Sequence, residues 1–409
     1  MGRKFARRQA GQEAPMGSWR NAYGRLGALA LILVIAAGCS SASATWPPVA
    51  PSGGVHVDLP GPSAAQTSQA VASEAPRATA ASATVDQITA DYVYTSELIT
   101  PIAHLYGSFI DDFVIVTVQN ANASPVKITV QSDIPGYTDK ASDTVTVDAN
   151  GSQEVRQNPR LTQAGYDSLN SQHPADLHVV VSYLESGQPR TVLDQTSQTL
   201  ITSRDDFPWS IKGFTQQENY QLVVAMITPT DPSVNTLIRT AANYDPNKIM
   251  TSGYDSAQDS DGTVWQRLSD IWQAETNDYN LTYISTPITF ASGQSQRIRL
   301  PGEVLDQSSG NCIELTLLYA AAAEYLGMQA ALVIVPGHAY VAISVDDTGD
   351  SYYFIETTMI GAATFDDASS TALAEWKKAQ PHVAAADADY AWIDVTSARK
   401  DGIVPIPWR

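Results

Sequence analysis

The sequence is poor in cysteine. Only Cys39 and Cys312 occur among its 409 residues, and there is no Cys-x-x-Cys pair and no His-x-x-x-His pair. A structural zinc site is therefore not expected, because such sites need several ligands at these spacings. A disulfide is not expected either, since Cys39 lies far from any segment that would form a core. A Walker-type phosphate loop is also missing, so the sequence points to no metal and no cofactor.

Basic residues are scarce as well. The chain holds 24 Lys and Arg against 43 Asp and Glu, which gives a net charge of −19. Residues 1–38 carry six basic residues and one acidic residue, so residues 39–409 alone carry a charge of −24. A surface this acidic repels phosphate backbones, and nucleic acid is not expected as a partner. The length is sufficient for two domains with additional tails.

The N-terminal region lacks an apolar run that would span a membrane comfortably. The run 26–37 follows a basic leader and is too short for that role. It ends in Ala36-Ala37-Gly38-Cys39-Ser40, which is similar to a bacterial lipobox. We expect residues 1–38 to be a lipoprotein signal peptide and Cys39 to carry lipid, such as palmitate. The lipid would hold the protein at the extracytoplasmic face of the cell membrane. An uncleaved anchor and an ordinary signal peptide are the alternatives.

Large apolar side chains are rare in residues 39–88, which are rich in Ala, Ser, Pro and Thr. Such a composition cannot bury a core, so we expect a disordered tether. From residue 89 to 206 the pattern changes to short alternating runs separated by turn residues, which favours a β-sandwich of immunoglobulin-like architecture. The expected strands are 113–118, 126–130, 144–147, 178–184 and 191–202.

Residues 207–409 show helical periodicity as well as strands, so the fold class is α+β. Start signals and apolar spacing predict helices over 232–244 and 263–275. The run 220–227 favours a strand. Further along, we expect a short helix at 373–378 and a last strand at 390–395.

The most informative stretch of the chain is 308–358. Cys312 follows the turn and cap residues 308–311, and apolar residues then recur at helical spacing up to Leu326, where Gly327 closes the run. Cys312 is therefore predicted to lie in the first turn of a helix. The free N–H groups and the positive dipole end there favour the reactive thiolate. A thiolate still needs a proton shuttle, and histidine is the usual one.

His338 opens an alternating run that places Tyr340 on its own face of the predicted strand. A turn cluster follows, and the chain returns as a strand that ends near Glu356. If Ser344 pairs with Tyr352, His338 and Glu356 are diagonal neighbours on one face, within reach of each other. If the register shifts by one residue, they face opposite ways. The sequence leaves both registers open.

Four motifs carry a resemblance to a known family. They are Gln296-Arg297-Ile298-Arg299-Leu300-Pro301, Gly310-Asn311-Cys312, Val335-Pro336-Gly337-His338-Ala339-Tyr340 and Ile355-Glu356-Thr357-Thr358. Together they resemble the transglutaminase-like superfamily, in particular a bacterial branch of papain-like cysteine enzymes, over roughly the last half of the chain. The resemblance implies that Cys312 is the nucleophile, His338 the base and Glu356 the residue that orients His338. The family more often has Asp in the third role, and a Trp where Tyr340 stands.

The resemblance also implies an activity. We expect a cysteine-dependent hydrolase or acyltransferase that acts on amide bonds, with a peptide or a cell-wall-like amide as substrate. A binding or scaffolding lipoprotein without turnover is the main alternative, because transglutaminase-like folds have inactive members. A structural surface protein is a third possibility.

Each residue also has a less specific interpretation. Cys312 could be a buried structural thiol, His338 a histidine in the core, and Glu356 a salt-bridged strand residue. Asp394 competes with Glu356 for the orienting role. The side chains of Gln296, Arg297 and Arg299 could bind a substrate carboxylate or help to hold an oxyanion, or they could only fix their own loop; the sequence does not decide between these roles.

Overall fold

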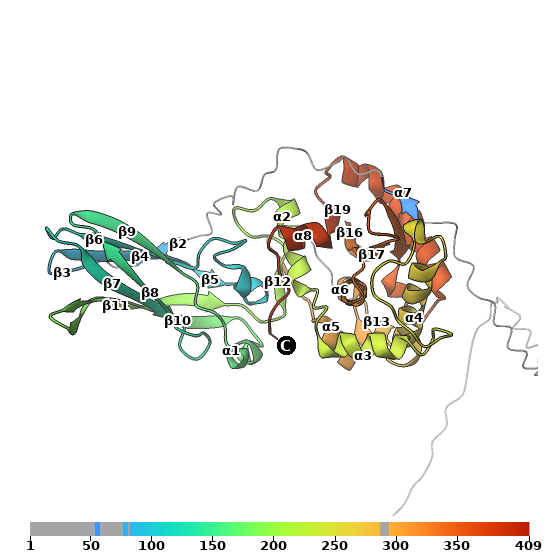
Figure 1. Cartoon of the computed structure of the whole chain (residues 1–409), viewed down its shortest axis with the longest axis horizontal. Helices are drawn as coiled ribbons and strands as arrows, with labels where there is room; N and C mark the ends of the chain where they lie inside the picture. Colours follow the sequence, from blue (N-terminus) through green and yellow to red (C-terminus); the bar gives the residue numbers. More distant parts are fainter. Residues whose placement is uncertain (1–53, 58–76, 81, 287–293, 409) are drawn as a thin grey trace, which may run out of the picture. The chain divides into compact units, whose positions relative to one another are not determined.

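The computed structural model describes residues 54–57, 77–80, 82–286 and 294–408 (Figure 1). The predicted signal peptide, Cys39 and most of the predicted tether lie outside these residues. The described residues all belong to one compact unit. This unit mixes helices and strands, which confirms the α+β class. Over the residues described, none of the helices combines the length and the apolar character that a membrane span needs.

Two five-stranded sheets form the first half of the described chain. One sheet contains β2 (Arg77–Thr79), β3 (Ala83–Val85), β4 (Ile88–Thr95), β6 (Val114–Asn120) and β9 (Gly151–Gln157). The other contains β5 (Glu97–Leu98), β7 (Val126–Asp133), β8 (Ala141–Val147), β10 (His173–Glu185) and β11 (Gln188–Ile201). Alternate residues of both sheets, such as Tyr92, Val116 and Val179, are buried in one core. This one-sided burial explains the alternation in the sequence.

Two short helical segments accompany these sheets, η1 (Thr100–Leu105) and α1 (Gln163–Ser168). Pro101 lies at the start of η1, and the side chain of Thr162 caps α1 by accepting a hydrogen bond from the backbone N–H of Gly165. Both segments bury apolar residues, including Ile102 and Tyr166, against the same core.

Part of the segment predicted to be a disordered tether is ordered. Strands β2 and β3 pair with β4, and β1 (Val55–His56) pairs with β18 (Ser351–Ile355). Disorder was predicted because residues 39–88 contain few large apolar side chains. Edge strands need few of them, because ladder hydrogen bonds satisfy their backbone groups and small residues such as Ala78 pack at the margin of the core.

The second half begins with helices. The pair α2 (Gln216–Gln221) and η2 (Leu222–Met226) replaces the strand predicted over 220–227, so that prediction is wrong. A capping box between Thr215 and Glu218 starts the helix. The following residues, from Leu222 to Ile227, are almost fully buried, and an apolar run buried on all sides has no periodicity that distinguishes a helix from a strand.

The other helices agree more closely with the sequence. Asp231 caps α3 (Pro232–Ala241), whose first residue is the predicted Pro232, and α4 (Thr263–Asn277) also forms where expected. The remaining elements here are η3 (Ala257–Asp259), α5 (Pro301–Asp306), α8 (Val395–Lys400), and two small strand pairs, β12 (Asp206–Pro208) with β14 (Ser295–Arg297) and β13 (Thr282–Tyr283) with β15 (Ser309–Gly310).

A third five-stranded sheet positions the site. Its strand order is β1, β18, β17 (His338–Ser344), β16 (Ala330–Val335) and β19 (Ala391–Asp394), with all pairs antiparallel. Helix α6 (Cys312–Tyr325) packs against β16 and β17, and α7 (Phe365–Ala384) packs against β18. The two faces of β17 belong to two different cores: Val341 and Ile343 lie in the one that includes α6, and Tyr340 lies with Trp376 of α7.

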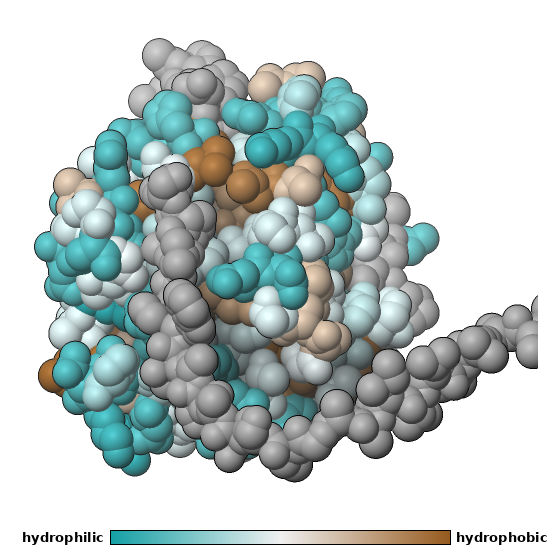
Figure 2. All heavy atoms as spheres, turned by 90° about the vertical axis from the view of Figure 1, so that its right-hand side faces the viewer, coloured by the Kyte–Doolittle hydropathy of each residue, from teal (hydrophilic) through white to brown (hydrophobic). Residues whose placement is uncertain are grey.

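Hydrophilic residues cover most of the coloured surface on the face shown in Figure 2, and hydrophobic residues reach it in a few small groups. The apolar residues of α6 contribute little to any surface, because every residue of that helix from Cys312 to Ala323 is buried.

Candidate functional site

Cys312 is the first residue of α6, as predicted. The backbone N–H of Glu314 donates to the side-chain oxygen of Asn311 over 3.0 Å, and the N–H of Asn311 donates to a carboxylate oxygen of Glu314 over 3.0 Å. This reciprocal capping box fixes the first turn. The first turn of a helix also has N–H groups without an acceptor inside the helix, and its dipole is positive there. The sulfur therefore lies beside groups that favour negative charge.

A buried ion pair holds the start of this helix in place. Nε and Nη2 of Arg299 donate to the two carboxylate oxygens of Glu314 over 2.9 Å and 2.7 Å. Only 15% of the Arg299 side chain and 3% of the Glu314 side chain are exposed. Charge-assisted bidentate pairs of this kind fix geometry as well as charge.

The residues around Arg299 are also engaged by the protein itself. Arg297, with 76% of its side chain exposed, pairs with Asp205. The side-chain oxygen of Gln296 accepts a hydrogen bond from the indole N–H of Trp209 over 3.1 Å. These contacts favour the interpretation that the motif 296–301 fixes its own loop and the helix start, rather than a substrate carboxylate.

His338 begins β17 directly after a two-residue turn. Pro336 and Gly337 form that turn, since Val335 pairs with His338. Gly337 has a φ of +71°, a value that a residue with a Cβ adopts only under strain. The turn therefore fixes where the strand starts, and with it the position of His338.

The strand register is the one that brings the predicted pair together. Ser344 pairs with Tyr352, so His338 and Glu356 are diagonal neighbours at one end of the sheet. Nε2 of His338 lies 2.7 Å from Oε2 of Glu356. The alternative register, with the two side chains on opposite faces, is excluded.

Glu356 is itself held on its other side. Its side chain is 4% exposed, and it caps the short helix η4 (Thr357–Met359). The carboxylate oxygen Oε1 accepts hydrogen bonds from the backbone N–H and the hydroxyl group of Thr358, over 3.1 Å and 2.5 Å. The other oxygen, Oε2, is thereby left to face His338.

The imidazole ring of His338 interacts with both Glu356 and Cys312. Burial lowers its pKa, but hydrogen bonds to the side chains of Cys312 and Glu356, together with electrostatic attraction, outweigh burial and raise the pKa from 6.5 to about 10. Since Nε2 faces Glu356, Nδ1 is the ring nitrogen available to the sulfur. Burial also opposes ionisation of Glu356, yet its bonds to His338 and Thr358 lower its pKa overall. At neutral pH the ring is therefore protonated.

The sulfur is enclosed. Cys312 has 0% exposure, and His338, with 25% of its side chain exposed, is the part of the pair that reaches the surface. A substrate carbonyl would therefore have to approach beside the imidazole, or the residues around the sulfur would have to move.

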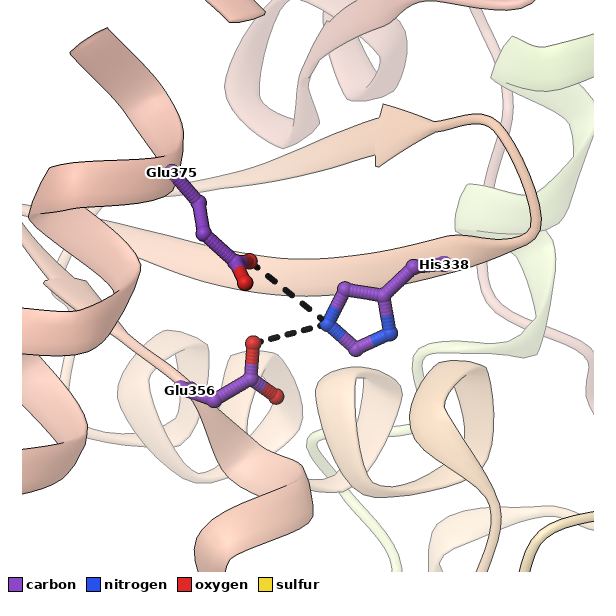
Figure 3. Close-up of side chains that lie close together, drawn as sticks. All are labelled: His338, Glu356 and Glu375. Atoms are coloured by element: carbon purple, nitrogen blue, oxygen red, sulfur yellow. Dashed lines mark hydrogen bonds and ion pairs between the residues drawn. The ribbon is translucent and has the colours of Figure 1, made fainter. Parts of the chain in front are cut away.

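One residue of the site was not predicted. Glu375, on α7, places Oε2 3.9 Å from Nε2 of His338, and Figure 3 shows its carboxyl group and that of Glu356 pointing toward the same ring nitrogen. Burial and the negative charge of Glu356 raise the pKa of Glu375. The sequence predicted only a short helix over 373–378. A polar residue within a helix gives no further signal of its direction, so Glu375 could be found only in three dimensions.

His338, Glu356 and Glu375 each offer one atom that could bind a metal ion, and these atoms lie within 4.8 Å of one another. Ligands of a tetrahedral zinc ion lie about 3.3 Å apart, given bonds of about 2.0–2.1 Å. The 2.7 Å contact between His338 and Glu356 is shorter than that, so an ion would have to displace their hydrogen bond. The arrangement therefore fits a hydrogen-bonded pair better than a metal centre.

Asp394, which competed with Glu356 for the orienting role, lies elsewhere, as do two further histidines. Asp394 caps α8 by accepting a hydrogen bond from the N–H of Ser397 over 2.7 Å, and its strand β19 is separated from β17 by β16. His382 pairs with Asp387, and His104 bonds the carbonyl group of Val404. Cys39, the predicted lipidation site, lies outside the described residues.

Comparisons with known proteins give no family. The chain matches no family model and no curated protein. Among solved structures it is similar to a crystal structure of a protein from Archaeoglobus fulgidus, with 8% identity over 31% of this chain and 93% of that one. It is also similar to the solution structure of a candidate late embryogenesis abundant (LEA) protein, with 11% identity over 32% of this chain and 72% of that one. Both likenesses have a TM-score of 0.18, too low to support a statement about fold or function.

Proposed function

We propose that this protein is a cysteine-dependent hydrolase or acyltransferase that acts on amide bonds, with Cys312 as nucleophile, His338 as acid and base, and Glu356 as the residue that orients the imidazole. One observation carries the proposal: the ring of His338 bonds a buried carboxylate through Nε2, and the side chain of Cys312, at the start of α6, is a second partner that raises the pKa of the same ring. This is the geometry that activates a thiol nucleophile. The same constellation recurs on unrelated folds, so the argument depends on the site.

The residues suggest the order of events. In the resting state Cys312 is a thiolate paired with the protonated ring of His338. The sulfur attacks the amide carbonyl and forms an S–C bond, and the oxygen that becomes negative lies toward the N–H groups at the start of α6. His338 gives its proton to the departing amine, the C–N bond breaks, and a thioester remains. Water or a second amine, from which His338 takes a proton, then releases the acyl group and restores the thiolate.

We propose for residues 207–409 a transglutaminase-like fold and for residues 89–206 an immunoglobulin-like sandwich. The helix that begins at the cysteine and the antiparallel sheet that carries the histidine support the first assignment. The two sheets with a shared core support the second. Lipid attachment at Cys39 would place the site at the extracytoplasmic face of the cell membrane, where peptides and cell-wall-like amides are the available substrates.

A binding or scaffolding role is the second candidate. Complete burial of Cys312 favours it, because a nucleophile must meet its substrate. The hydrogen-bonded ring favours catalysis, since a structural thiol does not require a protonated histidine beside it.

Labelling with an electrophilic peptide probe distinguishes the two. We expect wild-type protein to be labelled at Cys312 and His338→Ala to be labelled at least ten times more slowly, because it lacks the cation that stabilises the thiolate. His382→Ala is the matched control and should behave as wild type, since His382 pairs with Asp387 outside the site. If wild type and His338→Ala are labelled at the same rate, or if neither is labelled, the result supports the binding role instead of catalysis.

A further inference from the structure

Glu375 is a carboxyl group at the proposed site that the reaction described above does not use. It comes from α7, which packs on β18, whereas His338 and Glu356 come from β17 and from the end of β18. Figure 3 shows the three side chains converging on Nε2 of His338. Of the two contacts with that nitrogen, Glu356 makes the shorter, at 2.7 Å, and Glu375 the longer, at 3.9 Å.

The carboxylate of Glu356 has one acceptor position left. An ionised carboxylate accepts at about four lone-pair sites. The N–H and hydroxyl groups of Thr358 occupy Oε1, and His338 occupies one site of Oε2. The remaining site of Oε2 is open to a further donor.

Glu375 lies near this carboxylate, since one carboxyl oxygen of Glu375 lies within 4.8 Å of one carboxyl oxygen of Glu356. Oε2 of Glu375 is buried and has no hydrogen bond among the described residues, although 37% of the side chain as a whole is exposed. Two negative carboxylates this close repel each other, and a single imidazolium ion cannot satisfy both. A proton shared between them removes the repulsion and supplies the missing donor.

We propose that Glu375 is a positioning residue of this site: its neutral carboxyl group donates a hydrogen bond to Glu356 and holds that carboxylate against Nε2 of His338. The inference rests on the proposed function, because the imidazole ring that Glu375 helps to position is the proposed acid and base. It adds a fourth residue, which acts through Glu356 and touches no substrate.

The charged and titratable groups around Glu375 are few. Glu356, His338 and Tyr340 face it from the sheet, and Lys378 lies on its own helix. The negative charge of Glu356 disfavours ionisation of Glu375, whereas His338 and Lys378 favour it. Burial is the largest effect, and together with Glu356 it raises the pKa of Glu375.

Two substitutions separate this role from the alternatives. Glu375→Gln keeps a donor N–H without a titrating group, whereas Glu375→Ala removes the donor. Histidine NMR titration of the full chain measures the protonation of His338 directly. We expect Glu375→Gln to titrate within about 0.3 units of wild type and Glu375→Ala to shift His338 by about one unit toward its ordinary pKa, a tenfold change in the protonation constant. Alkylation of Cys312 should fall about tenfold in Glu375→Ala, and by less than twofold in Glu375→Gln.

Two results would overturn the proposal. If both variants lower the pKa of His338 equally, Glu375 acts as an ionised carboxylate; if neither changes it, Glu375 has no positioning role. Lys377→Ala is the control for a substitution on the same helix, at an exposed position. The titration needs no turnover, so failure of the proposed function, seen as unreactive Cys312 in wild type, is distinguishable from failure of this inference.

Discussion

Replacing Glu356 by glutamine tests the electrostatics of the site most closely. The substitution keeps the shape and a hydrogen-bonding group but removes the negative charge 2.7 Å from Nε2 of His338. An opposite charge at such a distance shifts a pKa by about 1–3 units. Because Cys312 remains as the second partner of the ring, only part of the shift to about 10 should be lost. We expect the pKa of His338 to fall by about 2 units, which corresponds to ~3 kcal/mol of differential interaction.

The assay is an NMR titration with labelled histidine, which is practicable because the chain has six histidines. Asp387→Asn is a matched control, since Asp387 also lies 2.7 Å from a ring nitrogen, that of His382, but both side chains are about half exposed. It should leave the titration of His338 unchanged and alter stability by less than ~1 kcal/mol. The reasoning is refuted if His338 in wild-type protein titrates near 6.5, or if Glu356→Gln leaves its titration where it was.

Three further predictions concern stability. Because the pKa of His338 is raised, its interactions stabilise the fold fully below about pH 6.5, and this stabilisation is lost as the pH rises through about 10. Denaturant unfolding should therefore show that the free energy of unfolding of wild type is lower at pH 10 than at pH 6 by an amount on the order of 3 kcal/mol. His338→Ala should not show this loss. Arg299→Ala leaves the buried carboxylate of Glu314 unpaired and should lower the free energy of unfolding by ~3–5 kcal/mol. The control Arg297→Ala, at a position 76% exposed, should lower it by less than ~1 kcal/mol. Equal losses in the two variants would show that burial of the ion pair does not determine its contribution to stability. Asn311→Ala removes the helix cap and should cost ~1 kcal/mol by thermal unfolding, and an unchanged melting temperature would contradict the capping argument.

The sequence was sufficient to predict the elements that carry the site. Cap residues before Cys312 and Gly327 after the run mark the two ends of α6, because capping hydrogen bonds act within one segment, and a largely buried run of 14 residues favours a helix over a strand by its length. The turn Pro336-Gly337 likewise fixes the start of β17. The register that joins His338 to Glu356 remained open, because a shift of one residue changes neither the composition nor the local pattern of either strand.

Glu375 was missed for a different reason. Helix α7 extends from Phe365 to Ala384, far beyond the predicted 373–378. A usable signal existed at its start, where Thr364 caps the helix and acidic residues occupy the first turn. That signal gives the helix but not the direction of Glu375, which depends on how α7 crosses β18.

Two other differences show where composition misleads. The strand predicted over 220–227 is helical, because a fully buried run has no polar face to reveal its period. The segment 39–88 contains short strands because edge pairing depends on backbone hydrogen bonds, which composition does not record.

Activation of the Cys312 sulfur by a protonated His338 can be measured as the rate of alkylation by iodoacetamide between pH 6 and 7. We expect wild-type Cys312 to react at least ten times faster than a free thiol of pKa ~8.5 at the same pH, and His338→Ala to remove this advantage. A sulfur that stays unreactive until the protein unfolds, in wild type and variant alike, would contradict this expectation.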